Sequence, residues 1–475
     1  MPVAPEDPTP PAEHAPEEPE LTARLADAGV HLVRRVVLDR PRVRTVPSCV
    51  SYSAHLSTDP ATAPAAVDTV TGGAALGDHG QARRAAVGEA VERHCANLVP
   101  DALPTAPYDR LVRAGRAALD PREAALHSPA QYAARGFPFV PMTRDLPLAW
   151  TTGLDLHDGT EVLVPASLTY VNYFRGARRA EPHTHHPVLA GTAAGPTVRD
   201  ARLAALREVL ERDAVTLWWL SGAPAAPLDT APDGPLATAL AEAAASGLRV
   251  TLLRIPSTFD VTVAGVFVED PVRRLVGFGS ACRATPGAAA AKALTEAVGM
   301  HETAMELLDG AGGFWTAVRA GRTGRSPYRD HREDRAYLQD FRPDWHDVND
   351  VRLHLQVHLD PRMQGARLDR LRTPRPGHRT HTSPPVGPAA PGLDGCLAML
   401  AAQGLRAVAV DLTPPRVRAA GLHVARVIVP GLTSNTPAAF PFLGGRRLHR
   451  EPAARGWILR PTRETDLVLS PLPFS

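Results

Sequence analysis

A five-residue motif, Glu-x-x-Glu-Arg, occurs twice in the chain, at residues 89–93 and 208–212. Residues three apart on an α-helix lie on one face, so each copy places two carboxylates side by side with an arginine next to them. The residues around both copies are largely apolar, which predicts two mostly buried helices. Buried carboxylates require partners, so the fold must bring cations to both faces.

The second helix carries another carboxylate, Asp200, ahead of Glu208 and Glu211. At about 100° and 1.5 Å per residue, Asp200 and Glu211 project within about 20° of each other and lie about 16 Å apart along the axis. That distance is too long for one ion and predicts a row of sites, for which Mg²⁺, which prefers oxygen ligands, is the expected ion. The alternative is an ordinary solvated helix face, which either copy of the motif alone would favour.

A third charged helix is expected near residues 287–308, where Lys292 and Glu296 stand four residues apart among apolar residues. Lys292 is the only lysine in the chain. An intrahelical ion pair explains this spacing locally. In the functional alternative, Glu296 joins the metal cluster and Lys292 faces a phosphate.

The rest of the chain predicts an α+β or α/β core with helices gathered against sheet. Residues 1–20, rich in proline and acidic residues, are expected to be a disordered tail, and residues 21–475 a single domain. The other predicted elements are a loop at 71–78, a hairpin at 147–174, an irregular surface region at 310–395, helices at 81–97, 197–220, 287–308 and 395–403, and strands at 248–256, 261–269, 275–281, 407–412 and 424–430.

Composition excludes several classes of function. The net charge of +2, from 52 basic and 50 acidic residues, gives no broad field for nucleic acid or an anionic membrane. No apolar run approaches the roughly 18 residues that a membrane span needs, and the N-terminus lacks the basic start and apolar centre of a signal peptide. The four cysteines form no C-x-x-C pair, so neither a zinc ribbon nor a disulfide framework is expected. We expect a cytoplasmic protein that binds neither nucleic acid nor membrane.

Several stretches, taken in order, resemble YcaO-domain proteins, in particular the cyclodehydratase subunit of thiazole/oxazole-modified peptide biosynthesis. They lie at residues 72–97, 147–173, 191–219, 277–299, 406–432 and 442–448. The resemblance implies a YcaO-type fold with an ATP site in which helix carboxylates hold Mg²⁺ ions that bridge the triphosphate. Consistent with this, the chain contains no G-x-x-x-x-G-K-[ST] P-loop.

The resemblance also assigns residues by position. The implied metal ligands are Glu89, Glu92, Asp200, Glu208, Glu211 and Glu296, and the implied nucleotide-binding cations are Arg93, Arg212 and Lys292. Pro471 and Pro473 match a proline-rich C-terminal tail that is expected to reach the active site as part of the catalytic machinery.

The implied reaction is ATP-dependent activation of a backbone amide in a ribosomally made precursor peptide. A Cys, Ser or Thr side chain attacks the preceding carbonyl, the oxyanion takes the γ-phosphoryl group, and loss of phosphate leaves an azoline. Thioamide or macroamidine formation remains open, because the nucleophile comes from the substrate or a partner.

Three positions depart from the family pattern. Ala85 replaces a serine, Lys292 replaces a glutamine, and Ser475 replaces the last proline of the tail. These changes keep open a catalytically degenerate scaffold or substrate-presenting subunit. Since no leader-binding module is expected within this chain, the implied partners are the precursor peptide, a winged-helix or ThiF-like leader-binding subunit and a second copy of the chain in a homodimer.

Overall fold

The computed structural model describes residues 18–41, 43–57, 69–375 and 391–474. Within these residues the strands form three sheets, and every pairing between their strands is antiparallel. The first sheet has the order β1 (Val33–Leu38), β2 (Cys49–Leu56), β3 (Val70–Leu76). The second has the order β11 (Leu275–Cys282), β10 (Val263–Asp270), β9 (Arg249–Ile255), β8 (Ala226–Pro227). The third has the order β4 (Thr105–Ala106), β5 (Leu148–Asp155), β12 (Val408–Asp411), β13 (His423–Ile428), β7 (Thr192–Gly195), and β6 (Glu161–Pro165) pairs with β5.

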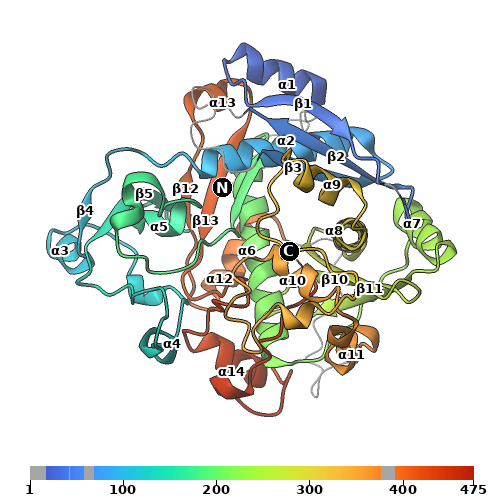
Figure 1. Cartoon of the computed structure of the whole chain (residues 1–475). Coiled ribbons are helices and arrows are strands. Elements are labelled where there is room, and N and C mark those ends of the chain that lie inside the picture. Colours follow the sequence, from blue (N-terminus) through green and yellow to red (C-terminus); the bar gives the residue numbers. More distant parts are fainter. Residues whose placement is uncertain (1–17, 42, 58–68, 376–390, 475) are drawn as a thin grey trace, which may run out of the picture.

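Three long helices lie among the sheets and carry the charged motifs (Figure 1). They are α2 (His79–Ala96), α6 (Val198–Ser221) and α8 (Pro286–Leu308). The remaining helices are α1 (Glu18–Asp27), α3 (Tyr108–Arg113), α4 (Pro129–Ala133), α5 (Ala166–Thr169), α7 (Gly234–Ala245), α9 (Gly313–Arg319), α10 (Arg352–Val357), α11 (Asp369–Arg372), α12 (Leu393–Ala401), α13 (Pro415–Ala419) and α14 (Arg447–Ala454).

Each long helix follows a strand of a different sheet: β3 precedes α2, β7 precedes α6, and β11 precedes α8. All three helices start at a side-chain cap, in which Asp78, Thr197 or Thr285 accepts a hydrogen bond from a backbone N–H of the first turn. Such a cap contributes about 1 kcal/mol. The same local signal thus begins all three charged helices.

Glycines let each helix lie almost in contact with the strand before it. A Cβ added to Gly73 would lie 2.2 Å from the backbone of α2, one on Gly195 2.7 Å from that of α6, and one on Gly279 2.2 Å from that of α8. Real Cβ atoms do not come this close, so these strand positions require glycine. The resulting backbone contacts set how far each charged helix stands from its sheet.

The sheet of β8 to β11 is covered on both faces. Alternate residues of β10 belong to different apolar clusters: Val263 and Phe267 pack with α6, whereas Ala264, Val266 and Val268 pack with α7 and α8. This follows from the two-residue period of a strand. The whole of β11 is buried, so α6 and α8 face each other across one layer of sheet.

Most of the predicted elements are confirmed. The helices predicted at 81–97, 197–220 and 287–308 are α2, α6 and α8, and the predicted hairpin is β5 and β6. The loop predicted at 71–78 is wrong for residues 71–76, which form β3 and pair with β2. Its Gly-rich sequence is typical of a loop. In the structure these small residues belong to a strand, and they allow α2 to pack closely against it.

The region predicted as an irregular surface insertion, 310–395, forms short helices and buries an apolar cluster of its own. Trp315, Tyr337 and Phe341 lie in that cluster, packed with the end of α8. The apolar residues of this cluster are few and irregularly spaced among many charged residues. The sequence therefore shows no helical or strand period here, and the core could not be predicted from it. Residues 376–390 of the region lie outside the described residues, as do residues 1–17 of the predicted tail, whereas residues 18–20 begin α1.

No helix in the described ranges is both long enough and apolar enough to cross a membrane.

Candidate functional site

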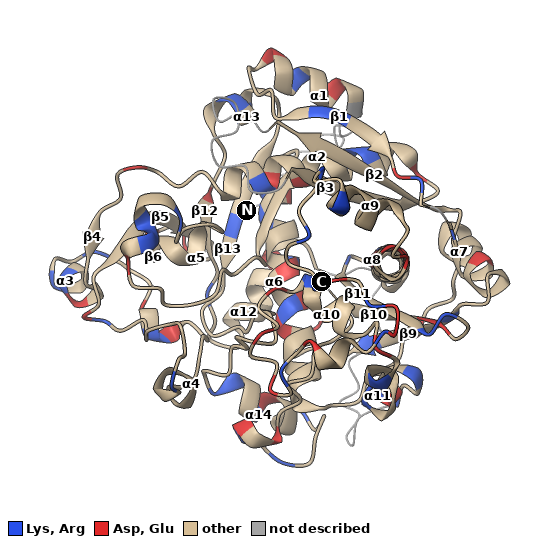
Figure 2. Cartoon of the chain, viewed as in Figure 1, with Lys and Arg blue, Asp and Glu red and all other residues tan. Residues whose placement is uncertain are grey.

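Each copy of the Glu-x-x-Glu-Arg motif forms ion pairs within its own helix. Arg93 Nη2 lies 3.5 Å from Glu89 Oε1 on α2. On α6, Arg212 Nε lies 3.9 Å from Glu208 Oε1, and its Nη1 lies 3.6 Å from Glu211 Oε1. Acidic and basic residues therefore occur together on both helices (Figure 2).

Glu211 is the most buried carboxylate of the group, and it ties α6 to the neighbouring strand β11. Ser280 Oγ donates to Glu211 Oε1 at 2.7 Å, and the Cys282 N–H donates to Oε2 at 2.9 Å. Burial raises the pKa of Glu211; Arg212 and the Ser280 hydrogen bond oppose the rise, and the carboxylate of Glu296 adds to it. The Ser280 N–H also donates to Glu296 Oε2 at 3.4 Å, so one serine contacts carboxylates of α6 and α8.

Glu92 links α2 to α6. Burial raises its pKa well above 4.5, and the negative charge of Glu208 on α6 raises it further, while Arg93 and a hydrogen bond from the Ala194 N–H oppose the rise. Glu208 accepts a hydrogen bond from the Gly191 N–H at 2.9 Å. Two carboxylates from different helices therefore repel each other where water is scarce.

Lys292 and Glu296 form an ion pair on α8, with Nζ 3.2 Å from Oε1. The charge of Lys292 also reaches α2: burial raises the pKa of Glu89, and the charges of Arg93 and Lys292 lower it. The structure thus brings together eight of the residues expected at the nucleotide site: Glu89, Glu92, Arg93, Glu208, Glu211, Arg212, Lys292 and Glu296.

Asp200 lies elsewhere. It is exposed in the first turn of α6, where its Oδ2 accepts a hydrogen bond from Thr197 Oγ1 at 2.6 Å. Glu208 is eight residues further along, about 12 Å up the axis. Across the described residues, no polar contact joins Asp200 to another of the expected ligands. It lies in the first turn, bonded to the capping residue Thr197, and a metal-binding role for Asp200 stays a prediction.

The carboxylates do not form a ready-made metal cage. In the part of the chain that the structure describes, no three Asp, Glu, His or Cys side chains are grouped so that they could hold an ion. Each carboxylate is held instead by backbone, hydroxyl or cationic donors. A metal ion at this site would need further oxygen ligands, of the kind that a phosphate chain supplies.

The C-terminal segment enters the same region (Figure 1). His358 Nε2 donates to the Pro471 carbonyl oxygen at 2.9 Å, and the Phe278 N–H on β11 donates to the Pro473 carbonyl oxygen at 2.9 Å. The ring of Phe474 then lies under the Arg212 guanidinium, 4.7 Å from centroid to carbon. The predicted tail residues thus lead to a motif arginine.

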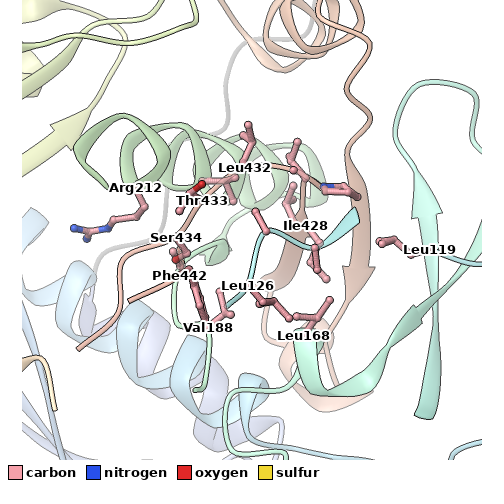
Figure 3. A pocket seen from close by; sticks show the side chains of 18 of the residues that line it. Leu119, Leu126, Leu168, Val188, Arg212, Ile428, Leu432, Thr433, Ser434 and Phe442 are labelled. Atoms are coloured by element: carbon pink, nitrogen blue, oxygen red, sulfur yellow. The ribbon is translucent and has the colours of Figure 1, made fainter. Parts of the chain in front are cut away.

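An apolar cavity of about 620 Å³, part of it open to solvent, borders Arg212 on another side. Leu126, Leu168 and Ile428 line it, and Figure 3 shows the Arg212 guanidinium pointing away from these apolar side chains. A second cavity, lined by tail residues 469–472 and Phe474, shares Phe442 with the first. Arg212 therefore lies between the apolar cavity and the acidic cluster, that is, the glutamates of α2, α6 and α8 described above.

Sequence reasoning missed two residues that organise the site. Ser280 is a polar residue in the otherwise apolar strand β11. Arg426 is buried in β13 and donates to the Val188, Leu189 and Leu168 carbonyl oxygens and to Thr192 Oγ1. A polar residue in a largely apolar strand was the available signal for both.

A family described as YcaO cyclodehydratase, binding ATP and Mg²⁺, matches residues 73–433. Among solved structures, a heterocyclase in complex with substrate and cofactor superposes with a TM-score of 0.68 and 18% identity, covering 100% of this chain and 59% of that one. The heterocyclase TruD gives a TM-score of 0.53 and 21% identity, covering 82% of this chain and 50% of that one. YcaO from Methanopyrus kandleri, bound with AMPPCP and Mg²⁺, gives 0.50 and 19%, covering 88% and 94%.

At these identities the structural likeness shows the fold alone. The chain spans 59% and 50% of the two heterocyclases. A search of curated proteins gave no match.

Proposed function

Because the chain belongs to the YcaO cyclodehydratase family, which is described as binding ATP and Mg²⁺, we propose that it activates backbone amides of a ribosomally made precursor peptide with ATP and converts Cys, Ser or Thr residues to azolines. The observation that carries this proposal is the meeting of carboxylates from α6 and α8 around Arg212, with Glu92 of α2 facing Glu208 beside them. The proposed partners are the peptide, a leader-binding subunit and a second copy of the chain.

The residues present fit a magnesium-bound triphosphate. Glu92 and Glu208 are like charges at close quarters, which a divalent cation would relieve. Burial disfavours the charged form of Arg212, but Glu211, Glu208 and Glu296 outweigh it and raise the pKa of the guanidinium, so Arg212 stays charged. Among the described residues, its buried Nη1 makes no hydrogen bond and is free to donate to an anion.

The reaction needs a poor leaving group, the amide oxygen, to be converted into a good one. The peptide thiol or hydroxyl loses its proton as it bonds to the carbonyl carbon, and the γ-phosphoryl group of ATP passes to the resulting oxyanion with release of ADP. Departure of phosphate, with loss of the amide proton, leaves the C=N bond of the azoline. When bound at Glu92 and Glu208, Mg²⁺ would supply positive charge to the triphosphate.

The chain's own contribution is to bind and orient. Glu92 and Glu208 are the proposed metal-binding pair, and Arg212 Nη1 is the proposed donor to a phosphate or oxyanion oxygen. Phe474 covers the face of that guanidinium, which limits its movement. The apolar cavities beside Arg212 offer space to side chains of the peptide.

The first test is a calorimetric titration of AMPPCP with Mg²⁺ into the purified full chain. We expect a dissociation constant of about 1–100 μM. Glu211→Gln should weaken binding at least about 100-fold. It removes a charge beside Arg212, and the glutamine NH2 group cannot accept the hydrogen bond that one of the two donors, Ser280 or Cys282, gives to the carboxylate. The control Glu333→Gln makes the same chemical change at an exposed residue and should bind like the wild type.

The second test is mass spectrometry of Cys-, Ser- and Thr-containing peptides incubated with the chain, its partner subunit and ATP. Loss of one water per modified residue fits an azoline or an amidine, and an azoline is distinguished because its formation consumes the Cys thiol or the Ser or Thr hydroxyl. Exchange of oxygen for sulfur identifies a thioamide. If the chain binds no nucleotide but is still required for modification in the complex, it acts as a scaffold. This is the alternative that the departures at Ala85 and Lys292 suggest.

A further inference from the structure

The only lysine of the chain lies inside the acidic cluster. Its Nζ is 3.2 Å from Glu296 Oε1, and its side chain is 36% exposed. Glu296 is also held by the Ser280 N–H, so the ion pair has a fixed place beside β11. Lys292 is therefore a positioned cation that solvent and a ligand can still reach.

Lys292 acts on two helices at once. It pairs with Glu296 on its own helix, α8, and its charge also lowers the pKa of Glu89 on α2, against the larger effect of burial. A cation between carboxylates of two elements is what a bridging metal ion would otherwise supply. An ammonium group is a compact point charge with several donors, which suits both carboxylate and phosphate oxygens.

On the side of the cluster between α2 and α6, two carboxylates face each other. Of the residues that the structure describes, none forms an ion pair with Glu92 within 4 Å, and Glu208 faces it from α6. Arg212 approaches Glu208 only to 3.9 Å. Glu92 and Glu208 thus repel each other between α2 and α6. The charges of Arg93, Arg212 and Arg426 oppose this repulsion only in part, because the pKa of Glu92 stays well above 4.5. A fixed positive charge lies between α2 and α8.

We propose that Lys292 takes the place of one divalent cation in the nucleotide complex, so that metal binding is confined to the Glu92 and Glu208 side of the site. This inference rests on the proposed function, since it assigns the charges around the bound nucleotide. A divalent ion beside the ammonium would be repelled, whereas one between Glu92 and Glu208 would be attracted.

The test counts metal ions. The folded full chain is saturated with AMPPCP, and the bound Mn²⁺ per nucleotide is measured by electron paramagnetic resonance of the free ion. Lys292→Gln, a neutral side chain of similar length, should bind one more Mn²⁺ per nucleotide than the wild type. It should also need roughly tenfold more Mg²⁺ for half-maximal AMPPCP binding. Lys292→Arg keeps the charge and should match the wild type in both measurements.

Equal metal counts in the wild type and Lys292→Gln, with nucleotide bound to both, would overturn this inference and leave the proposed function intact. A folded Lys292→Gln protein that binds no AMPPCP at saturating Mn²⁺ would overturn it too, since a metal ion should then replace the lost charge. A wild type that binds no AMPPCP at any metal concentration contradicts the proposed function and the inference together. Thermal unfolding of each variant checks that it is folded.

Discussion

At the scale of single residues, the buried charge of Arg426 is held by several neutral acceptors rather than by one opposite charge. Arg426, 1% exposed, donates to three carbonyl oxygens and one hydroxyl. Burial lowers the pKa of its guanidinium to about 10, with Glu208 and Glu92 opposing the shift. A network in which each of the three guanidinium nitrogens donates keeps such a charge tolerable inside the protein.

Glu302 on α8 predicts a pH dependence of stability. Burial raises its pKa from 4.5 to about 7; Arg44 opposes the rise, and Asp39 and Glu306 add to it. Between about pH 4.5 and 7 the folded state keeps a proton that the unfolded state has released, so stability falls as pH rises through this window. Above about pH 7 the loss is complete, and we expect it to be on the order of 1–3 kcal/mol.

Urea unfolding at pH 5 and pH 8 measures this dependence. Glu302→Gln should remove a large part of the difference between the two pH values, because glutamine does not titrate. Glu333→Gln, at an exposed position, should leave the difference as it is in the wild type. A pH dependence that is unchanged in Glu302→Gln would assign the effect to other groups.

At the scale of elements, the site depends on how closely a helix can approach its strand. The carboxylates of α2, α6 and α8 meet because glycines in β3, β7 and β11 admit the helix backbones at short range. A shift of one helix by the width of a methyl group would move its charges against the other two. Backbone packing and site geometry are therefore coupled.

Gly279→Ala tests this coupling. The added Cβ would lie 2.2 Å from the Ala293 carbonyl oxygen and 2.7 Å from Glu296 Cβ, so α8 must move. We expect a loss of about 3 kcal/mol in unfolding free energy. Nucleotide affinity should fall at least about tenfold, since a displacement near 1 Å spoils a preorganised site. Chemical denaturation and AMPPCP titration measure the two effects.

Gly299→Ala is the matched control, because Gly299 lies on the same helix and an added Cβ meets no atom within 4 Å. It should stabilise the protein by up to about 1 kcal/mol through helix propensity and leave affinity unchanged. If both alanine variants behaved alike, close packing would not be what positions α8.

At the scale of the whole molecule, the C-terminal segment joins parts that are distant in sequence. The Trp219 indole N–H donates to the Ser470 carbonyl oxygen at 2.8 Å, while Pro471 and Pro473 are held by His358 and Phe278. These contacts connect α6, β11 and the end of α10. The segment thus holds these elements together. Its last described residue, Phe474, covers Arg212.

Removal of residues 470–475 should therefore cost both stability and affinity. Three hydrogen bonds and the burial of Leu472 and Phe474 are lost, for about 3–5 kcal/mol. Phe474→Leu keeps an apolar side chain. It removes the cation–π contact with Arg212, worth about 0.5–2 kcal/mol, and the edge-to-face ring contact with Phe278. We expect AMPPCP affinity to fall in both proteins. A truncated protein that is destabilised but binds AMPPCP normally would limit the tail to a structural role.

The sequence by itself determined the three charged helices and the spacing of the carboxylates along each of them. Apolar periodicity is a local property, so α2, α6 and α8 could be predicted within two residues at each end. The motif spacing also placed each glutamate next to its arginine on the helix surface.

Only the tertiary structure decided which of the predicted residues meet. Helical geometry put Asp200 on the same side as Glu211, but the Asp200 side chain is exposed at the start of α6, where it bonds to Thr197. Ser280 and Arg426 bind residues 69 or more positions away along the chain. Contacts of this kind depend on how strands and helices pack, and packing is a property of the whole fold that no local pattern encodes.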